Sequence, residues 1–175
     1  MLKRVLGGLL LIVSGSAIVY TLDAAYAAEQ PKVDYATMKV ADLVAKTAKG
    51  QLKNPYTDSQ ADIVAQGEHL YLSYGCNGCH GGGGGGGMCP PLTNDTWVYG
   101  GDDDTLFRLV TLGSDELQKA GYTRKGREGV VGPMPAFGGI VKSADDLWKV
   151  FAFVRSKYSP NADPLYKFGT PPEQQ

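Results

Sequence analysis

Two cysteines and a histidine lie within five positions, in the segment CNGCH at residues 76–80. Two thiols at this spacing can add to the two vinyl groups along one edge of a porphyrin. The histidine that follows the second thiol then lies beneath the iron, where imidazole is a strong axial ligand. The segment fits the C-x-x-C-H attachment pattern of c-type haem. We therefore predict one covalent haem c on Cys76 and Cys79, with His80 as a metal ligand.

Two other uses of this segment are weaker. A zinc site would need two further nitrogen or sulfur ligands, and only Cys89 and His69 remain. A thioredoxin-like redox pair would place its C-x-x-C at the N-terminus of a helix after a strand. Here a predicted amphipathic helix ends at Cys76, and no strand precedes it.

The sixth ligand of the iron decides what such a site does, because an open site binds oxygen or peroxide and a filled one mainly passes electrons. Met134 lies between Pro133 and Pro135, which fix the backbone torsions on both sides, so we predict Met134 as the second axial ligand. Met88 would have to reach around the haem edge across the glycine run, and His69 is expected on the surface. The side chains that we considered are Met38, Met88, Met134 and His69.

The sequence pattern predicts that the elements that position these residues are helices. Residues 58–75 carry an apolar stripe of 3.6-residue period, with Asp58 or Ser59 as the expected N-cap, and lead directly into Cys76. Further helices are expected within 38–50, 102–113, 113–121 and 143–158, the last opened by a capping box at Ser143. No segment is typical of a strand. We predict an all-α fold of four to five helices with long loops around one haem.

The N-terminal segment of the chain predicts export. Residues 1–27 combine Lys3 and Arg4, an apolar stretch and an A-x-A cleavage site, which is typical of a signal peptide and of a periplasmic protein. An uncleaved membrane anchor is the alternative, because the apolar stretch approaches spanning length. Residues 28–58 then form an N-terminal extension, 59–158 the haem domain and 159–175 a C-terminal tail. The formal net charge of −1 and the lack of a basic patch argue against nucleic acid as a partner.

Seven glycines follow the haem segment, at residues 81–87. A turn without side chains would leave the haem edge accessible to a docking partner. A flexible loop that tolerates changes of length is the second interpretation. Cys89 is left over once haem takes its pair, and we expect a small buried hydrophobic side chain, with a reactive or intermolecular thiol as the alternative.

Residues 60–158 resemble the class I cytochromes c. The resemblance rests on CNGCH, the segment CPPL at 89–92, the loop GPMPAFGG and an aromatic last helix. It implies that Gly67 and Phe153 meet where the first and last helices cross, and that the carbonyl of Pro90 accepts the Nδ1–H of the axial histidine. It also implies that Trp97 covers the haem and donates to a propionate, with core packing as the alternative. Cys89 stands where many members of the family have glycine.

A narrower resemblance covers most of the chain. The segment NPYTD, the glycine-rich turn, NDTWVYGGDDDTLF and GPMPAFGG are similar to those of the cytochrome c-L group. Those proteins are periplasmic electron acceptors of PQQ-dependent methanol dehydrogenases, including the lanthanide-dependent type. The resemblance implies such a dehydrogenase as donor and a downstream cytochrome or oxidase as acceptor, with no enzymatic activity of the chain itself.

Other interpretations stay open from the sequence. One is a general electron shuttle without a dedicated dehydrogenase, and another is a haem enzyme or gas sensor with five-coordinate iron. The acidic run of Asp102, Asp103 and Asp104 is typical of a helix start, but could also steer a basic partner or bind calcium.

Overall fold

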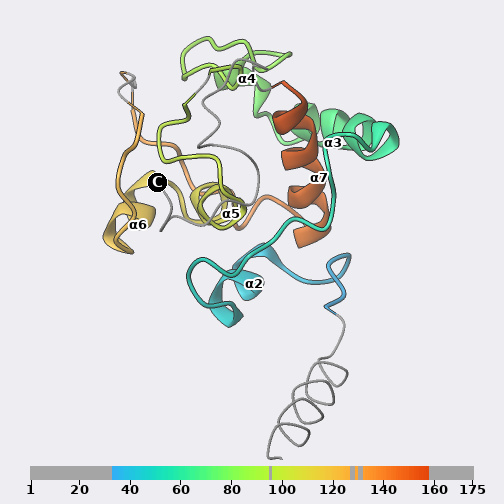
Figure 1. Ribbon diagram of the computed structural model, residues 1–175, viewed down its shortest axis with the longest axis vertical. Coiled ribbons are helices and arrows are strands. Elements are labelled where there is room, and N and C mark those ends of the chain that lie inside the picture. Colours follow the sequence, from blue (N-terminus) through green and yellow to red (C-terminus); the bar gives the residue numbers. More distant parts are fainter. Residues whose placement is uncertain (1–32, 95, 127–128, 130–131, 158–175) are drawn as a thin grey trace, which may run out of the picture. The chain divides into compact units, whose positions relative to one another are not determined.

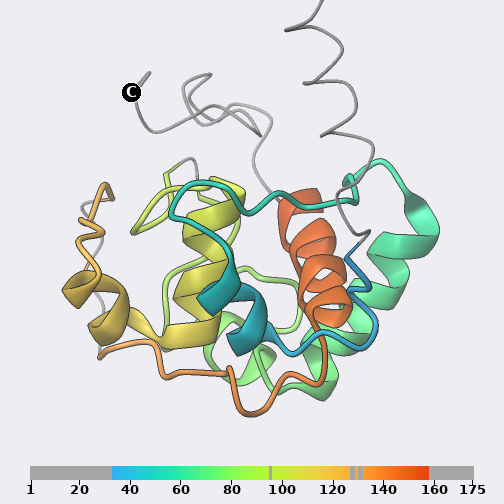
Figure 2. The same ribbon diagram turned by 90° about the horizontal axis from the view of Figure 1, so that it is seen from below.

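The computed structural model describes residues 33–94, 96–126, 129 and 132–157. The predicted signal peptide and the predicted C-terminal tail lie outside the described residues. Those residues include no strand, so the all-α fold is confirmed, and none of their helices is long and apolar enough to cross a membrane. The helices, drawn in Figures 1 and 2, are α2 (Val40–Lys46), α3 (Ala61–Ser73), α4 (Asn77–His80), α5 (Asp103–Leu112), α6 (Ser114–Lys119) and α7 (Ala144–Ser156).

Helices α3 and α7 pack closely against each other (Figures 1 and 2). A Cβ on Gly67 would lie 2.0 Å from the carbonyl oxygen of Lys149 and 3.0 Å from the Cβ of Phe153, so only glycine fits there. One turn further along α3, the ring of Tyr71 lies 5.1 Å from that of Phe153, centroid to centroid. The crossing that we predicted at Gly67 and Phe153 is confirmed, and it fixes the direction in which α3 approaches the haem segment.

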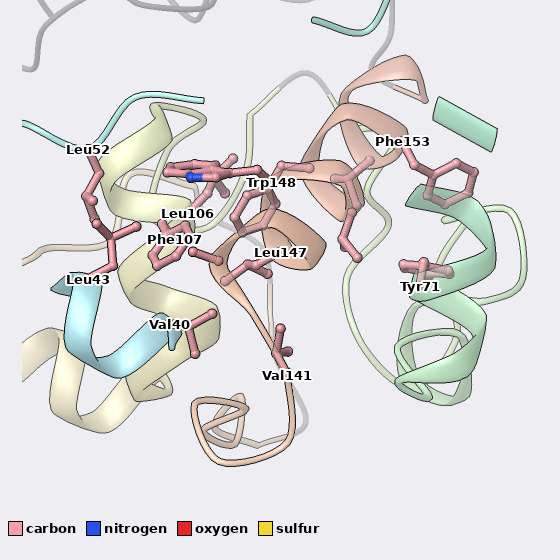
Figure 3. Close-up of a cluster of buried hydrophobic side chains, with 14 of the residues drawn as sticks. Val40, Leu43, Leu52, Tyr71, Leu106, Phe107, Val141, Leu147, Trp148 and Phe153 are labelled. Atoms are coloured by element: carbon pink, nitrogen blue, oxygen red, sulfur yellow. The ribbon is translucent and has the colours of Figure 1, made fainter. Parts of the chain in front are cut away.

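Residues 34–56, which we call the brace, pack against one side of helices α5 and α7. The rings of Phe107 and Trp148 are both fully buried, with centroids 4.3 Å apart. Val40, Leu43 and Leu52 from the brace belong to the same hydrophobic cluster, which Figure 3 shows. The described part of the predicted N-terminal extension therefore belongs to the same packed core as the haem domain.

Backbone and charged groups complete the contact with the brace. Arg108 on α5 donates to the carbonyl oxygens of Thr47 (2.7 Å) and Ala48 (3.1 Å) just after α2. The amide of Ala144 at the start of α7 donates to the carbonyl of Met38 (2.8 Å). Because these hydrogen bonds satisfy helix-end groups that would otherwise lack partners, they hold the brace in one register.

Two of the predicted helix starts are confirmed and one is wrong. The carboxylate of Asp102 accepts the amide of Thr105, and the hydroxyl of Ser143 accepts the amide of Asp146. Helix α3, however, has Gln60 as its N-cap, not Asp58 or Ser59. The side chain of Gln60 accepts the amide N–H of Thr57 (2.7 Å), so a local turn sets the boundary one or two residues later than the preference for acids and serines suggested.

Candidate functional site

A cavity of about 450 Å³ lies on the side of α5 and α7 that the brace does not cover. Its walls are mostly apolar, which suits a large flat hydrophobic group. Helix α5 contributes Leu106, Leu109 and Val110, and α7 contributes Val150, Phe151 and Val154. The remaining wall comes from the end of α3, the haem segment, residues 89–92 and 97–100, helix α6 with Arg124 beyond it, and the loop around Met134.

The predicted haem-binding residues meet in this cavity. Cys76, Cys79 and His80 all line it, with His80 ending the single turn α4. The Nδ1 of His80 lies 2.8 Å from the carbonyl oxygen of Pro90. Since a carbonyl can only accept, Nδ1 must carry the proton, which leaves the lone pair of Nε2 for a metal. The expected hydrogen bond between His80 and Pro90 is present, and the residues fit a covalent haem.

The sulfur and phenol groups beside the haem segment are held in their neutral forms. Burial raises the pKa of the Cys76 thiol to about 11 and that of the Tyr71 phenol to about 12. The hydroxyl of Tyr71 donates to the carbonyl of Gly81 (2.7 Å), which ties α3 to the chain just after the haem segment. Because the thiolate is the reactive form of cysteine, this folded environment suits sulfur already bonded in a thioether.

Met134 lines the cavity, and the other side chains considered for the sixth position do not. Met88 is 60% exposed and His69 is exposed on α3. Met38 is partly buried against the hydrophobic cluster that the brace shares with α5 and α7. The placement favours Met134 by exclusion among the described residues, and its bond to iron stays a prediction.

The glycine run forms a folded turn with its own hydrogen bonds. Gly86 donates to the carbonyl of His80 (2.9 Å), and Leu92 donates to that of Gly84 (2.7 Å). Gly81, Gly84 and Gly86 have positive φ, a conformation that other residues rarely adopt. By contrast, a Cβ on the glycines at 82, 83 and 85 would meet nothing within 4 Å. The backbone therefore requires glycine at some positions of the run and leaves the others free.

Trp97 has a different hydrogen bond from the one we expected. It is buried and lines the cavity, but its indole N–H donates to the carbonyl of Leu92 (3.1 Å). This bond engages the donor that we had assigned to a haem propionate and favours the alternative of core packing, while a contact of Trp97 with haem stays a prediction. The polar cavity-lining side chains that could hold propionates are Tyr99, Gln118 and Arg124.

The acidic run belongs to the brace contact, not to a partner surface. Asp103 and Asp104 are buried, at 7% and 2% exposed. Asp103 pairs with Arg155, and Asp104 pairs with Arg108 at 3.0 Å. The expectation that these acids steer a partner is wrong for Asp103 and Asp104, because arginines and backbone amides already engage them. Calcium binding gains no support either, since the described residues contain no group of three or more His, Cys, Asp or Glu side chains that could hold a metal.

Cys89 lies beside the haem segment, partly exposed rather than fully buried as expected. Its amide donates to the carbonyl of Cys79 (3.1 Å), and its side chain lines the cavity. Burial raises the pKa of the Cys89 thiol, and a hydrogen bond with Cys79 raises it further. The thiol is therefore kept protonated.

Sequence reasoning missed Ser114, the first residue of α6. Its hydroxyl and amide both bond to the backbone of Met134. A serine after Gly113 carries no local signal of such a role, because the contact joins residues 20 positions apart.

The comparisons with known proteins agree with this site. Residues 62–154, more than half of the chain, match the family model described as "Cytochrome C oxidase, cbb3-type, subunit III". Neither the curated proteins nor the solved structures gave a match. The matched segment contains the haem segment, the cavity walls and almost all of α3 and α7. The chain thus belongs to the family of cytochrome c oxidase, cbb3-type, subunit III, and its haem domain is a class I c-type cytochrome.

Proposed function

We propose that this protein is a periplasmic electron carrier that accepts single electrons from a PQQ-dependent methanol or alcohol dehydrogenase. It passes them to a downstream cytochrome or oxidase. Haem c supplies the one-electron exchange between Fe(III) and Fe(II). Family membership supports the monohaem electron-transfer part of the proposal. The donor and the location rest on the resemblance to the cytochrome c-L group.

The residues that line the cavity have different roles in this function. Cys76 and Cys79 hold the porphyrin, and Pro90 keeps the imidazole of His80 oriented and basic. Met134 would be the second protein ligand of the iron, and oxygen and peroxide would then find no open position there. A thioether in that position favours the reduced state and raises the potential relative to a second histidine.

The structural observation that goes with the narrower resemblance is a contact between two of its segments. The backbone N–H of Asn54, the first residue of NPYTD, donates to the carboxylate of Asp103 (3.0 Å) in the acidic run. The Asn54 side chain donates to the carbonyl of Trp148 on α7 (3.0 Å). Asn54 precedes the region that the family model matches. The brace therefore joins two segments of the narrower resemblance in one packed unit, and one of these segments lies outside the part of the chain that the family model matches.

The test is stopped-flow reduction of the haem-loaded protein by a PQQ-dependent methanol dehydrogenase and methanol, followed in the haem bands. We expect fast reduction that saturates with protein concentration, as a small and transient docking contact would give. The control is a small general carrier cytochrome with the same His/Met ligands, which should be reduced much more slowly.

Slow reduction of both proteins, with ascorbate still reducing the haem, would contradict the proposed donor. The protein would then be a general shuttle, the second function that the family match supports. Oxidation of the reduced protein by a terminal oxidase preparation would measure that function directly.

A further inference from the structure

Met134 lies between two residues that have no backbone N–H to donate, Pro133 and Pro135. The backbone N–H of this three-residue stretch is therefore that of Met134, which also has its own carbonyl. Both are engaged by one residue. The amide of Met134 donates to the hydroxyl of Ser114 (3.1 Å), and the amide of Ser114 donates to the carbonyl of Met134 (2.9 Å).

Ser114 is well placed to act as a fixed anchor. It is 5% exposed and is the first residue of α6. Gly113 before it has φ +79°, and a Cβ there would lie 2.9 Å from the carbonyl oxygen of Met134. This close approach brings the backbone of Ser114 against that of Met134, and a bulkier residue at 113 would separate them.

The loop after Met134 is also tied down, but to a different helix. Phe137 donates to the carbonyl of Val110 (2.8 Å), and Gly138 donates to that of Thr111 (3.0 Å) on α5. These bonds hold the far end of the loop. Ser114 alone among the described residues is shown bonding Met134 itself, through two hydrogen bonds.

We propose that Ser114 is a positioning residue that keeps the Met134 thioether at the iron, an inference that rests on the proposed His80 and Met134 ligation. Without the serine hydroxyl, the Met134 amide loses its acceptor and the ligand dissociates more often. Ser114 lines the cavity, but the role proposed for it is exerted through the backbone of Met134 and not as a ligand of its own.

The experiment measures how readily imidazole displaces the sixth ligand in the oxidised, haem-loaded protein. In Ser114→Ala we expect imidazole to bind about fivefold more tightly, the factor that corresponds to one ordinary hydrogen bond. Ser114→Thr keeps the hydroxyl and should restore wild-type affinity. Ser73→Ala is the matched control, because it also removes one hydroxyl bonded to backbone (Ser73 to His69, 2.7 Å), on an exposed face of α3.

A second measurement needs no variant, in case Ser114→Ala does not mature. In the reduced wild-type protein, hydrogen exchange at the Met134 amide should be slow, and exchange as fast as in a free loop would overturn the inference. Equal imidazole affinities for wild type and Ser114→Ala would also overturn it. If wild type shows no Met–Fe(III) charge-transfer absorption, the ligand assignment itself fails together with the inference. If wild type shows the band but Ser114→Ala binds imidazole with the wild-type affinity, the ligand assignment stands and only the role of Ser114 is overturned.

Discussion

Helices α5 and α7 present two sides that are filled in opposite ways. On one side, Phe107 and Trp148 pack against the brace, and arginines and aspartates form buried ion pairs. On the other, Leu109 and Val150 face a cavity of about 450 Å³. The first side is filled by side chains of the chain itself, whereas the second has apolar walls that would bury a haem. The chain thus supplies a rigid frame on one side so that the other can be shaped for haem.

The largest expected effect tests whether the brace side can hold the fold by itself. In Cys76→Ala/Cys79→Ala, haem cannot attach, and the apolar walls of the cavity lose the large hydrophobic group that they would bury. We expect no cooperative thermal transition in circular dichroism. The control Cys89→Ala should attach haem and melt like wild type. Cooperative melting of the double variant would show that the brace side holds the fold without haem.

A smaller effect is expected from the brace side. Asp104 accepts from Arg108 (3.0 Å), Tyr122 (2.6 Å) and the amide of Leu52 (3.2 Å). Although burial raises its pKa, these hydrogen bonds outweigh burial and leave the pKa of Asp104 below its ordinary value. Asp104→Asn should lower the free energy of unfolding at pH 7 by about 3 kcal/mol, because it leaves the arginine buried without a counter-charge.

The same carboxylate predicts how stability depends on pH. Its contribution is fully present above the unfolded-state pKa of about 3.9 and is lost as pH falls through the lower folded-state pKa. Urea titrations between pH 2.5 and 7 should therefore show a steeper acid loss in wild type than in Asp104→Asn, with Asp62→Asn on exposed α3 as control. The haem spectrum of Asp104→Asn should match wild type at pH 7. A changed spectrum would mean that the two sides are not independent.

The smallest expected effect is a difference in stability between alanine substitutions at two glycines of the turn after the haem segment. Gly84 is buried with φ +76°, whereas Gly83 is exposed and a Cβ there would meet nothing within 4 Å. Gly84→Ala should cost about 1–2 kcal/mol in chemical denaturation, because alanine is strained in that conformation. Gly83→Ala should change the stability by less than about 0.5 kcal/mol. Equal effects would show that the turn is not held as described.

Local patterns in the sequence predicted much of the fold and part of the site. Periodicity gave the helices, the C-x-x-C-H spacing gave the haem segment, and the prolines around Met134 singled it out among the methionines. These signals lie within a few residues of each other, so a sequence contains them directly.

The rest depends on contacts between distant segments. Asp103 looks like an ordinary helix-start acid until Arg155 is placed beside it, and Trp97 looks like a donor to haem until Leu92 accepts its N–H. Ser114 matters only because α6 begins next to the methionine loop. No local pattern contains such pairings, because the fold decides which polar groups meet.

The central claim is that the cavity holds iron between His80 and Met134. The most direct measurement is the Met–Fe(III) charge-transfer absorption of the oxidised protein in wild type, Met134→Ala and the matched control Met88→Ala. We expect the band in wild type and in Met88→Ala and its loss in Met134→Ala, with carbon monoxide binding rapidly only to the reduced Met134→Ala protein. A band that survives in Met134→Ala, or rapid binding of carbon monoxide to wild type, would contradict the account.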